Sequence, residues 1–214
     1  MFHGMATKSN SKCKRCRRLG RSVCGSLTCA FLKRPEPPGP VRKGRRGRRG
    51  GASEYGKQLL AKQEMKALYG IRERQFRNYV RELILKQKSR TRPAAAEFLW
   101  ALERRLDNVV YRMGFATSRS VARQFVSHGH ILVNGLRVTI PSYSLRVGDA
   151  VAVHGISKSK AVFKNNAAHL ADYQVPLWCK VDKEKLEGRV VSSSSPDDTG
   201  DTVNFQMIFE YYAR

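Results

Sequence analysis

The chain has 214 residues, of which 41 are Lys or Arg and 17 are Asp or Glu, so its formal net charge is +24 at pH 7. It holds no apolar run long enough to span a membrane, and its first residues lack the apolar centre of a secretory signal. A charge of this size favours a polyanionic partner, either a nucleic acid or an anionic membrane surface.

The positive charge is concentrated in the first two-thirds of the chain. Residues 1–50 hold 15 basic and 1 acidic side chains, a net +14, and residues 51–150 hold 18 and 8, a net +10. Residues 151–214 hold 8 of each and are neutral. We therefore expect the polyanion to contact the first two-thirds, and the last third to serve folding and protein contacts.

Four of the five cysteines form a compact C-x2-C-x7-C-x4-C pattern made of Cys13, Cys16, Cys24 and Cys29. The first pair has the spacing with which two thiolates bind one metal ion, and the second pair is close enough to complete a tetrahedral site. The segment has too few apolar residues to fold alone, so a structural Zn²⁺ would supply folding energy. A redox dithiol and a disulfide pair are the alternatives. Cys179, which follows a tryptophan, is expected to be a buried apolar residue.

Residues 35–53, PEPPGPVRKGRRGRRGGAS, are rich in Pro, Gly and Arg and have almost no apolar side chains. Such a segment cannot bury a core, so we expect a linker that becomes ordered on RNA. Its guanidinium and ammonium groups are suited to phosphate oxygens. The side chains expected to bind there are Arg42, Lys43, Arg45, Arg46, Arg48 and Arg49.

Residues 54–89 are predicted to be helical, because apolar side chains recur with a period near 3.6 residues and Gly70 provides a stop. The helix after Gly70 is expected to bury Phe76, Tyr79, Val80, Leu83 and Ile84. Its other face carries an arginine stripe that is either solvated or phosphate-binding: Arg72, Arg74, Arg77 and Arg81. A third helix is predicted to start at Pro93 and to continue to about Gly114.

Residues 102–153 are predicted to form two helices followed by a small sheet. Thr117 or Ser118 can cap the second helix, so that its N-terminal amides face outward. The pattern ILVNGLRVTI predicts a hairpin with strands at 131–133 and 136–140, joined by a type I′ turn at Asn134-Gly135. A further strand is expected at 150–153.

The stretches LERRLDNVVYRMGF and SRSVARQFVSHGHILVNG and the VGD turn resemble the RNA-binding domain named after the small-subunit ribosomal protein S4. The flanks resemble the S4 ribosomal protein family itself, in SEYGKQLLAKQEMKALYGIRERQFRNYVREL, VPLWCKVDKEKLEG and FQMIFEYYAR. The four-cysteine knuckle followed by PPG is similar to that of zinc-bearing bacterial members. The resemblance is to the bacterial or organellar type, and it covers nearly the whole chain.

The resemblance implies a structural component of the small ribosomal subunit, located on cytoplasmic ribosomes in preference to organellar ones. Its implied partner is 16S rRNA, where it would nucleate assembly of the 5′ domain. It would also lie beside the channel through which mRNA enters, contact the neighbouring ribosomal protein numbered five, and contribute to translational accuracy. Neither a membrane nor a small-molecule substrate is implied.

The expected fold is α+β, with a zinc knuckle at 1–34, a basic arm at 35–53 and a helical domain at 54–101. An S4-type RNA-binding domain is expected at 102–165, inserted before a C-terminal extension at 166–214 that packs back on the helical domain. RNA helices are recognised mainly through phosphates, 2′-hydroxyls and shape.

The side chains expected to contact RNA come from two parts of the chain. Those of the S4-type domain are Arg104, Arg105, Arg119, Ser120, Arg123, Gln124, His128 and Asn134. Those of the helical part are Lys57, Lys62, Arg72, Arg74, Arg77, Asn78 and Arg81. Tyr55 and Tyr69 either pack in the core or stack on bases, and packing is the favoured interpretation.

An RNA-modifying enzyme that carries the same domain is the main alternative. It would need a catalytic domain, and the residues after 153 are too few and hold no catalytic constellation. His128 and His130 lack a third ligand or an acid nearby in the sequence, so neither metal binding nor catalysis is expected of them. No catalytic residue is therefore predicted.

Overall fold

The computed structural model describes residues 13–25, 29–39, 53–85, 93–163, 170, 173–194 and 205–212. The chain divides into two compact units, Met1–Ile71 with Val203–Arg214 and Arg72–Thr202. The domain boundaries expected from the sequence stay a prediction. None of the helices in the described part of the chain is long and apolar enough to cross a bilayer.

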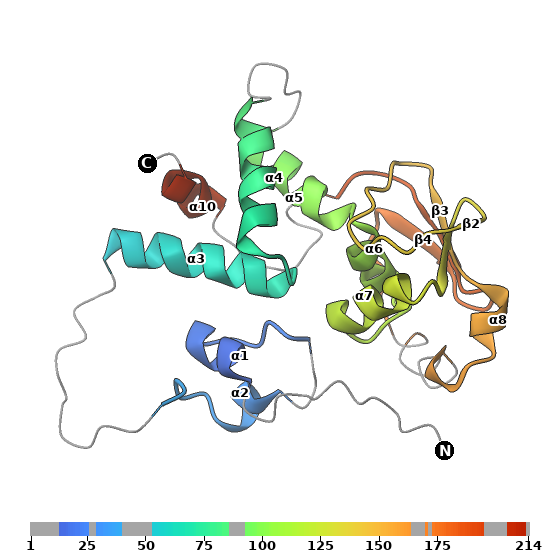
Figure 1. The fold of residues 1–214 in the computed structure, drawn as a ribbon, viewed down its shortest axis with the longest axis horizontal. Helices are drawn as coiled ribbons and strands as arrows, with labels where there is room; N and C mark the ends of the chain where they lie inside the picture. The colour runs from blue at the N-terminus through green and yellow to red at the C-terminus, as the bar shows by residue number, and fades with distance from the viewer. Residues whose placement is uncertain are drawn as a thin grey trace. The chain divides into compact units, whose positions relative to one another are not determined.

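The first unit contains α1 (Lys14–Leu19), α2 (Ala30–Lys33), α3 (Glu54–Leu68) and α10 (Phe205–Tyr212). Ser53 caps α3, since its Oγ accepts a hydrogen bond from the Gly56 amide over 3.2 Å. Figure 1 shows α10, in red, beside α3, in cyan, and Gln58 Nε2 donates to Glu210 Oε2 across this contact over 3.0 Å. The C-terminal helix therefore belongs to the same unit as the first long helix.

The second unit begins with two packed helices, α4 (Glu73–Leu85) and α5 (Ala94–Glu103). Phe76 and Phe98 meet edge to face, with ring centroids 5.4 Å apart. Phe76, Val80 and Leu83 are buried as expected, but Ile84 is 49% exposed. The apolar stripe of α4 is therefore narrower than its sequence predicts.

The single helix predicted from Pro93 to Gly114 is wrong, because the structure has α5 and then α6 (Leu106–Arg112). Arg105 takes an extended conformation at the break. The amide of Leu106 donates to Tyr143 O over 2.8 Å, and the Leu145 amide donates to Arg104 O over 2.8 Å. These bonds to a distant loop end one helix and start the next. The apolar period of the sequence continues through the break, so the sequence alone predicts a single helix.

Two further helices, α7 (Arg119–Ser127) and α8 (Gly155–Lys158), accompany a five-stranded antiparallel sheet of order β2-β1-β3-β5-β4. Its strands are β1 (Ile131–Val133), β2 (Leu136–Arg137), β3 (Ala150–Val153), β4 (Cys179–Asp182) and β5 (Glu187–Val190). Strands β4 and β5, which the sequence did not predict, extend the sheet beyond the three predicted strands. The fold is α+β.

The predicted hairpin is confirmed at its turn and shortened at its second strand. Asn134 and Gly135 have φ values of 49° and 81°, as a type I′ turn requires. Strand β2 ends at Arg137 instead of continuing to 140. The chain then turns toward α6, where Pro141 O accepts from the Asp107 amide over 3.1 Å.

The core of the second unit lies between α6, α7 and the inner face of the sheet. Buried and half-buried side chains alternate along β1 and β3, as expected for a sheet with one covered face. Cys179 is 5% exposed within this core, and burial raises the pKa of its thiol to about 12. The prediction that Cys179 is a buried apolar residue is confirmed.

Candidate nucleic-acid interface and cysteine cluster

Cys13, Cys16, Cys24 and Cys29 come together although α1 and α2 are short. Their sulfur atoms all lie within 4.8 Å of one another, and all four are free thiols. The Cys13 and Cys16 sulfurs are 3.0 Å apart, and the Val23 amide donates to Cys16 Sγ over 3.3 Å. Four sulfurs at this separation match the donor set of a tetrahedral zinc site.

The burial and the hydrogen bonds of each thiol set its pKa. Burial raises the pKa of Cys16 far above its usual range, although the Val23 hydrogen bond opposes this. Burial also acts against ionisation of Cys29, but hydrogen bonds from the Phe31 amide and Ser22 lower its pKa to about 7. A metal ion that bound here would have to displace protons from closely spaced thiols.

Asp107 organises basic side chains around the start of α6. Arg105, 1% exposed, donates from Nε to Oδ1 over 3.1 Å and from Nη2 to Oδ2 over 2.8 Å. Arg105 Nη1 also donates to Tyr79 OH of α4 over 3.0 Å. Arg123 Nε of α7 lies 3.9 Å from Asp107 Oδ2, and its side chain is 41% exposed. One buried carboxylate therefore links α4, α6 and α7 of the second unit.

A second buried carboxylate, Glu103, starts a chain of contacts that ends at Arg119. Arg112 Nη2 donates to Glu103 Oε1 over 2.7 Å and Nε donates to Oε2 over 3.0 Å, so the pair is bidentate. Asn108 Nδ2 donates to the same carboxylate. Asn108 Oδ1 accepts from Arg119 Nε over 2.8 Å, and the Arg119 guanidinium lies 4.7 Å from the Tyr111 ring centroid. Arg119 is therefore held in one orientation.

The start of α7 combines this arginine with a helix N-terminus. Ser118 Oγ accepts from the Val121 amide over 3.4 Å, which confirms Ser118 as the cap. The half-buried Arg119 and the exposed Ser120 follow in the first turn, where a helix has backbone amides without an intrahelical acceptor. One and two turns later come the half-buried Gln124 and the exposed His128. Positive charge and amide donors are thus gathered where an anionic group can approach.

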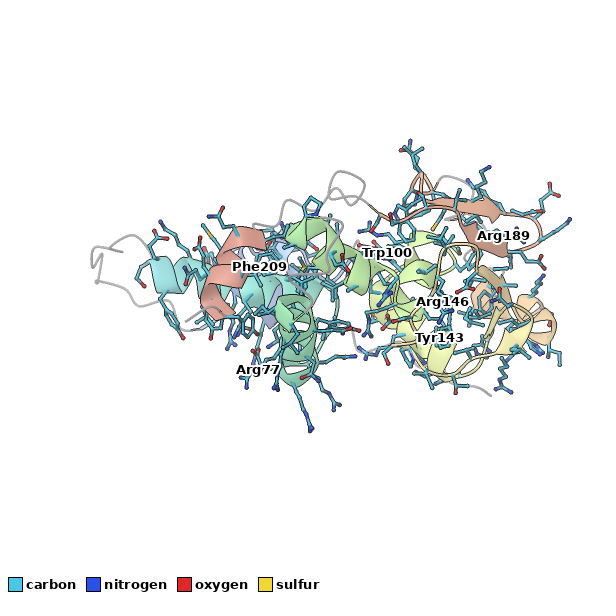
Figure 2. The ribbon with its side chains drawn as sticks, turned by 90° about the horizontal axis from the view of Figure 1, so that it is seen from above. Arg77, Trp100, Tyr143, Arg146, Arg189 and Phe209 are labelled. Atoms are coloured by element: carbon cyan, nitrogen blue, oxygen red, sulfur yellow. The ribbon has the colours of Figure 1, made fainter. Side chains whose placement is uncertain are left out.

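The exposed side of α4 carries the arginine stripe expected from the sequence. Figure 2 shows Arg77 at the outer surface of this helix. The exposed members of the stripe are Arg72, Arg74, Arg77, Asn78 and Arg81. Because α4 and α7 belong to the same compact unit and are linked through Tyr79 and Asp107, the unit presents exposed arginines on α4 and half-buried arginines on α7.

Two residues predicted to contact RNA are buried in the structure. Lys62 is 5% exposed, and its Nζ lies 4.1 Å from the Tyr211 ring centroid in a cation–π contact. Arg105 is buried in an ion pair with Asp107, so its charge is neutralised inside the fold. The charge of Asp107 and its hydrogen bonds outweigh burial and raise the pKa of Arg105. The sequence alone does not show which cations are buried with a partner and which are exposed.

Three other predicted residues have contacts within the fold. Asn134 donates to Asp149 Oδ1 and accepts from the Ala150 amide, both over 2.9 Å, so its side chain braces the hairpin turn. Arg104 is half-buried beside a small cavity. Lys57 is exposed and donates to Glu54 Oε1 over 2.7 Å. The six basic residues of the arm lie outside the described residues: Arg42, Lys43, Arg45, Arg46, Arg48 and Arg49.

Tyr55 and Tyr69 differ in the structure. Tyr69 is 5% exposed, which confirms its packing role. Tyr55 is 49% exposed, and its ring centroid lies 5.7 Å from that of Tyr211. Glu103, Asp107 and Asn108 were not predicted as part of the site. The sequence LERRLDN could have indicated them. Its charged residues lie within an apolar helix pattern, and charged side chains that become buried need partners.

Helices α6 and α7 pack on an antiparallel sheet, and half-buried arginines are held at the start and middle of α7. Residues 104–151 match the family described as S4 domain, and residues 7–99 match the Ribosomal protein S4/S9 N-terminal domain. The two matches together cover most of the chain.

Three similar proteins carry the same name. The chain is 41% identical over 216 residues to the small ribosomal subunit protein uS4 of Syntrophomonas wolfei, covering 98% of this chain and 100% of the relative. It is 43% identical to that of Chloroflexus aurantiacus, covering 92% and 94%, and 42% identical to that of Thermus thermophilus, covering 94% and 96%. The chain belongs to the uS4 family of small ribosomal subunit proteins. It is accordingly a structural protein of the ribosome and not an enzyme.

Proposed function

We propose that this protein binds 16S rRNA directly and nucleates assembly of the 5′ domain of the small subunit in the cytoplasm. The observation that carries the proposal is the pair of contacts that hold Arg119 on Asn108 and Arg123 near Asp107. Arginines fixed in advance lose little conformational freedom when they bind phosphate. An RNA duplex presents phosphates at regular spacing, which suits such a set of fixed cations.

The proposed RNA contacts are those that remain exposed or half-buried. They are Lys57, Arg72, Arg74, Arg77, Asn78, Arg81, Arg104, Arg119, Ser120, Arg123, Gln124, His128 and Asn134. Arm residues 42–49 are proposed as further contacts on the basis of composition alone. Lys62 and Arg105 are not included, because both are buried in ionic or cation–π contacts.

We further propose one structural Zn²⁺ on Cys13, Cys16, Cys24 and Cys29. The separation of their sulfurs supports it, as does the amide donor to Cys16. The knuckle has only a small buried cluster around Val23, so metal bonds would supply much of its folding energy. Contacts with mRNA, with the ribosomal protein numbered five, and a part in translational accuracy are proposed from the family alone.

The test is binding of the full-length protein to naked 16S rRNA, measured from about 50 to 300 mM salt. We expect the logarithm of affinity to fall steeply and linearly with the logarithm of salt, because several phosphates are neutralised. Chemical footprints should be confined to the 5′ domain. Arg119→Ala should reduce the salt slope by about 1. Urea unfolding of the variant measures separately the stability lost with its bond to Asn108.

Gln174→Ala, a change at an exposed and uncharged position, is the control for nonspecific effects of mutation. Equal affinity for 16S rRNA and for an unrelated RNA of the same length would contradict the proposal, and so would an affinity insensitive to salt.

A further inference from the structure

The neutral last third of the chain contains a pair of cations placed side by side. Lys180 of β4 and Arg189 of β5 are direct cross-strand partners, and both are exposed. Two residues away, Asp182 and Glu187 form the next pair in the same register. Because side chains alternate between the faces of a strand, all four lie on the outer face of the sheet.

The inner face at this place is occupied by the core. Val181 packs against the core cluster, and a Cβ at Gly188 would lie 2.8 Å from Met113 Sδ. The four charged side chains therefore cannot turn inward, and their register fixes which charges are neighbours. Like charges placed directly opposite each other destabilise a strand pair. The basic pair thus has an unfavourable placement that folding does not explain.

The two pairs differ in their partners. Asp182 Oδ2 lies 3.9 Å from Lys185 Nζ, and Glu187 Oε1 lies 3.5 Å from Lys158 Nζ, so each carboxylate of the acidic pair has a lysine partner. Within the part of the chain that the structure describes, no acidic side chain forms an ion pair with Lys180 or Arg189. The basic pair retains its full charge.

A shallow groove of about 370 Å³ lies over these strands, lined by Ala150, Lys180, Asp182, Glu187, Gly188 and Arg189 among others. Ala150 is the β3 residue directly opposite Arg189, and its methyl group leaves the basic end of the groove open. Figure 2 labels Arg189 on the β4–β5 pair, at the end of the five-stranded sheet. The groove thus holds two adjacent cations and a small neighbour at one end, and the carboxylates of Asp182 and Glu187 at the other.

We propose that Lys180 and Arg189 bind a backbone phosphate of rRNA, so that the outer face of β3, β5 and β4 is a second RNA contact of this protein. This inference rests on the proposed binding of 16S rRNA. It departs from the expectation drawn from the charge distribution, in which the last third of the chain does not contact RNA. Charge complementarity favours a phosphate, because a single anion between the two cations relieves their repulsion and neutralises both.

Lysine acetylation of the full-length protein with and without 16S rRNA tests the site directly. We expect Lys180 to become protected from the reagent in the complex. Lys185, at the tip of the same hairpin and 74% exposed, should keep its reactivity and serves as the internal control. Equal reactivity of Lys180 in the free and bound protein overturns the inference.

A matched pair of double variants separates the site from overall charge. K180Q/R189Q should reduce the salt slope of 16S rRNA binding by about 1. Its urea midpoint should be unchanged or higher, because the like-charge pair is removed. K160Q/K183Q removes the same charge from exposed positions outside this pair and should change the slope less. Equal changes in both variants would mean a general effect of charge and would overturn the inference.

Two other outcomes would give Lys180 and Arg189 a different role. Aggregation of K180Q/R189Q with unchanged rRNA binding would mean that the cations only protect the β4 edge. Normal rRNA binding with defective joining of other small-subunit proteins would mean an acidic protein partner. Either result overturns the inference. Arg119→Ala, measured in parallel, tests the proposed function separately. If only Arg119→Ala reduces the salt slope, the second RNA contact is overturned and the proposed function stands. If the wild-type protein does not bind 16S rRNA, both proposals are overturned.

Discussion

Asn108 Oδ1 accepts a hydrogen bond from Arg119 Nε over 2.8 Å, and this contact fixes an arginine of α7 on a buried amide of α6. The amide itself is oriented by Glu103, which accepts from Asn108 Nδ2 and is held by Arg112. The order from core to surface is therefore a carboxylate, an amide and a guanidinium. Such an arrangement sets the direction of the surface cation before any RNA binds.

Asn108→Ala should weaken rRNA binding although Asn108 itself is buried. Without its acceptor, Arg119 samples other rotamers, and ordering it on RNA costs more free energy. In a double-mutant cycle with Arg119→Ala, we expect a coupling of about 0.5–3 kcal/mol in the free energy of binding. Ser127→Ala, an exposed change at the end of α7, is the control. Strictly additive effects of the two alanine changes would rule out the positioning role.

Glu103→Ala should destabilise the fold by about 3–5 kcal/mol, because it leaves Arg112 buried without its counter-charge. Urea unfolding measures this loss. Replacing both partners in Glu103→Leu/Arg112→Met should recover most of it, since an apolar pair of similar volume needs no counter-charge. If the double variant is as unstable as Glu103→Ala, the buried pair is not the cause of the loss.

Cys16→Ser should abolish stoichiometric zinc, whereas Cys179→Ser should leave it intact. Cys16 belongs to the cluster of four sulfurs, and Cys179 is buried in the sheet core of the other unit. Metal analysis of freshly purified reduced protein should give about one zinc per chain in the wild type. Chelation should unfold residues 10–32 and spare residues 102–153. Wild-type protein without zinc, or Cys16→Ser with full zinc, would contradict the site.

The stability of the second unit should fall in mild acid because of His130. Partial burial lowers its pKa below the usual value, and further lowering comes from the positive charges of Lys160, His128, Arg137 and His154. The unfolded chain therefore takes up a proton at His130 near pH 6.5, while the folded protein does not. Stability rises with pH up to about 6.5 and is then constant as far as this group is concerned.

Thermal unfolding between about pH 5 and 7.5 tests this dependence. His130→Gln should show a weaker loss of stability below about pH 6.5 than the wild type. The exposed His128→Gln, two residues away, retains His130 and should keep most of the loss. Identical pH profiles for wild type and His130→Gln would show that another group is responsible.

Local features of the sequence predicted much of this protein. The spacing of Cys13, Cys16, Cys24 and Cys29 predicted a cluster, because residues a few positions apart can converge through short helices. Asn134-Gly135 predicted its turn, since both residues tolerate positive φ. The arginine stripe of α4 followed from helical periodicity. In each case the determining interactions lie within about 20 residues of one another.

The tertiary structure decided what depends on distant partners. Lys62 is buried because Tyr211, far along the chain, provides an aromatic face for its ammonium group. Arg105 is buried because Asp107 and Tyr79 supply its hydrogen bonds, and the α5–α6 break exists because a loop near Tyr143 bonds to the start of α6. By itself, the sequence determined that the chain carries an excess of cations suited to RNA. Which cations remain at the surface was decided by packing, because a charge can leave water only where the folded chain brings it a partner.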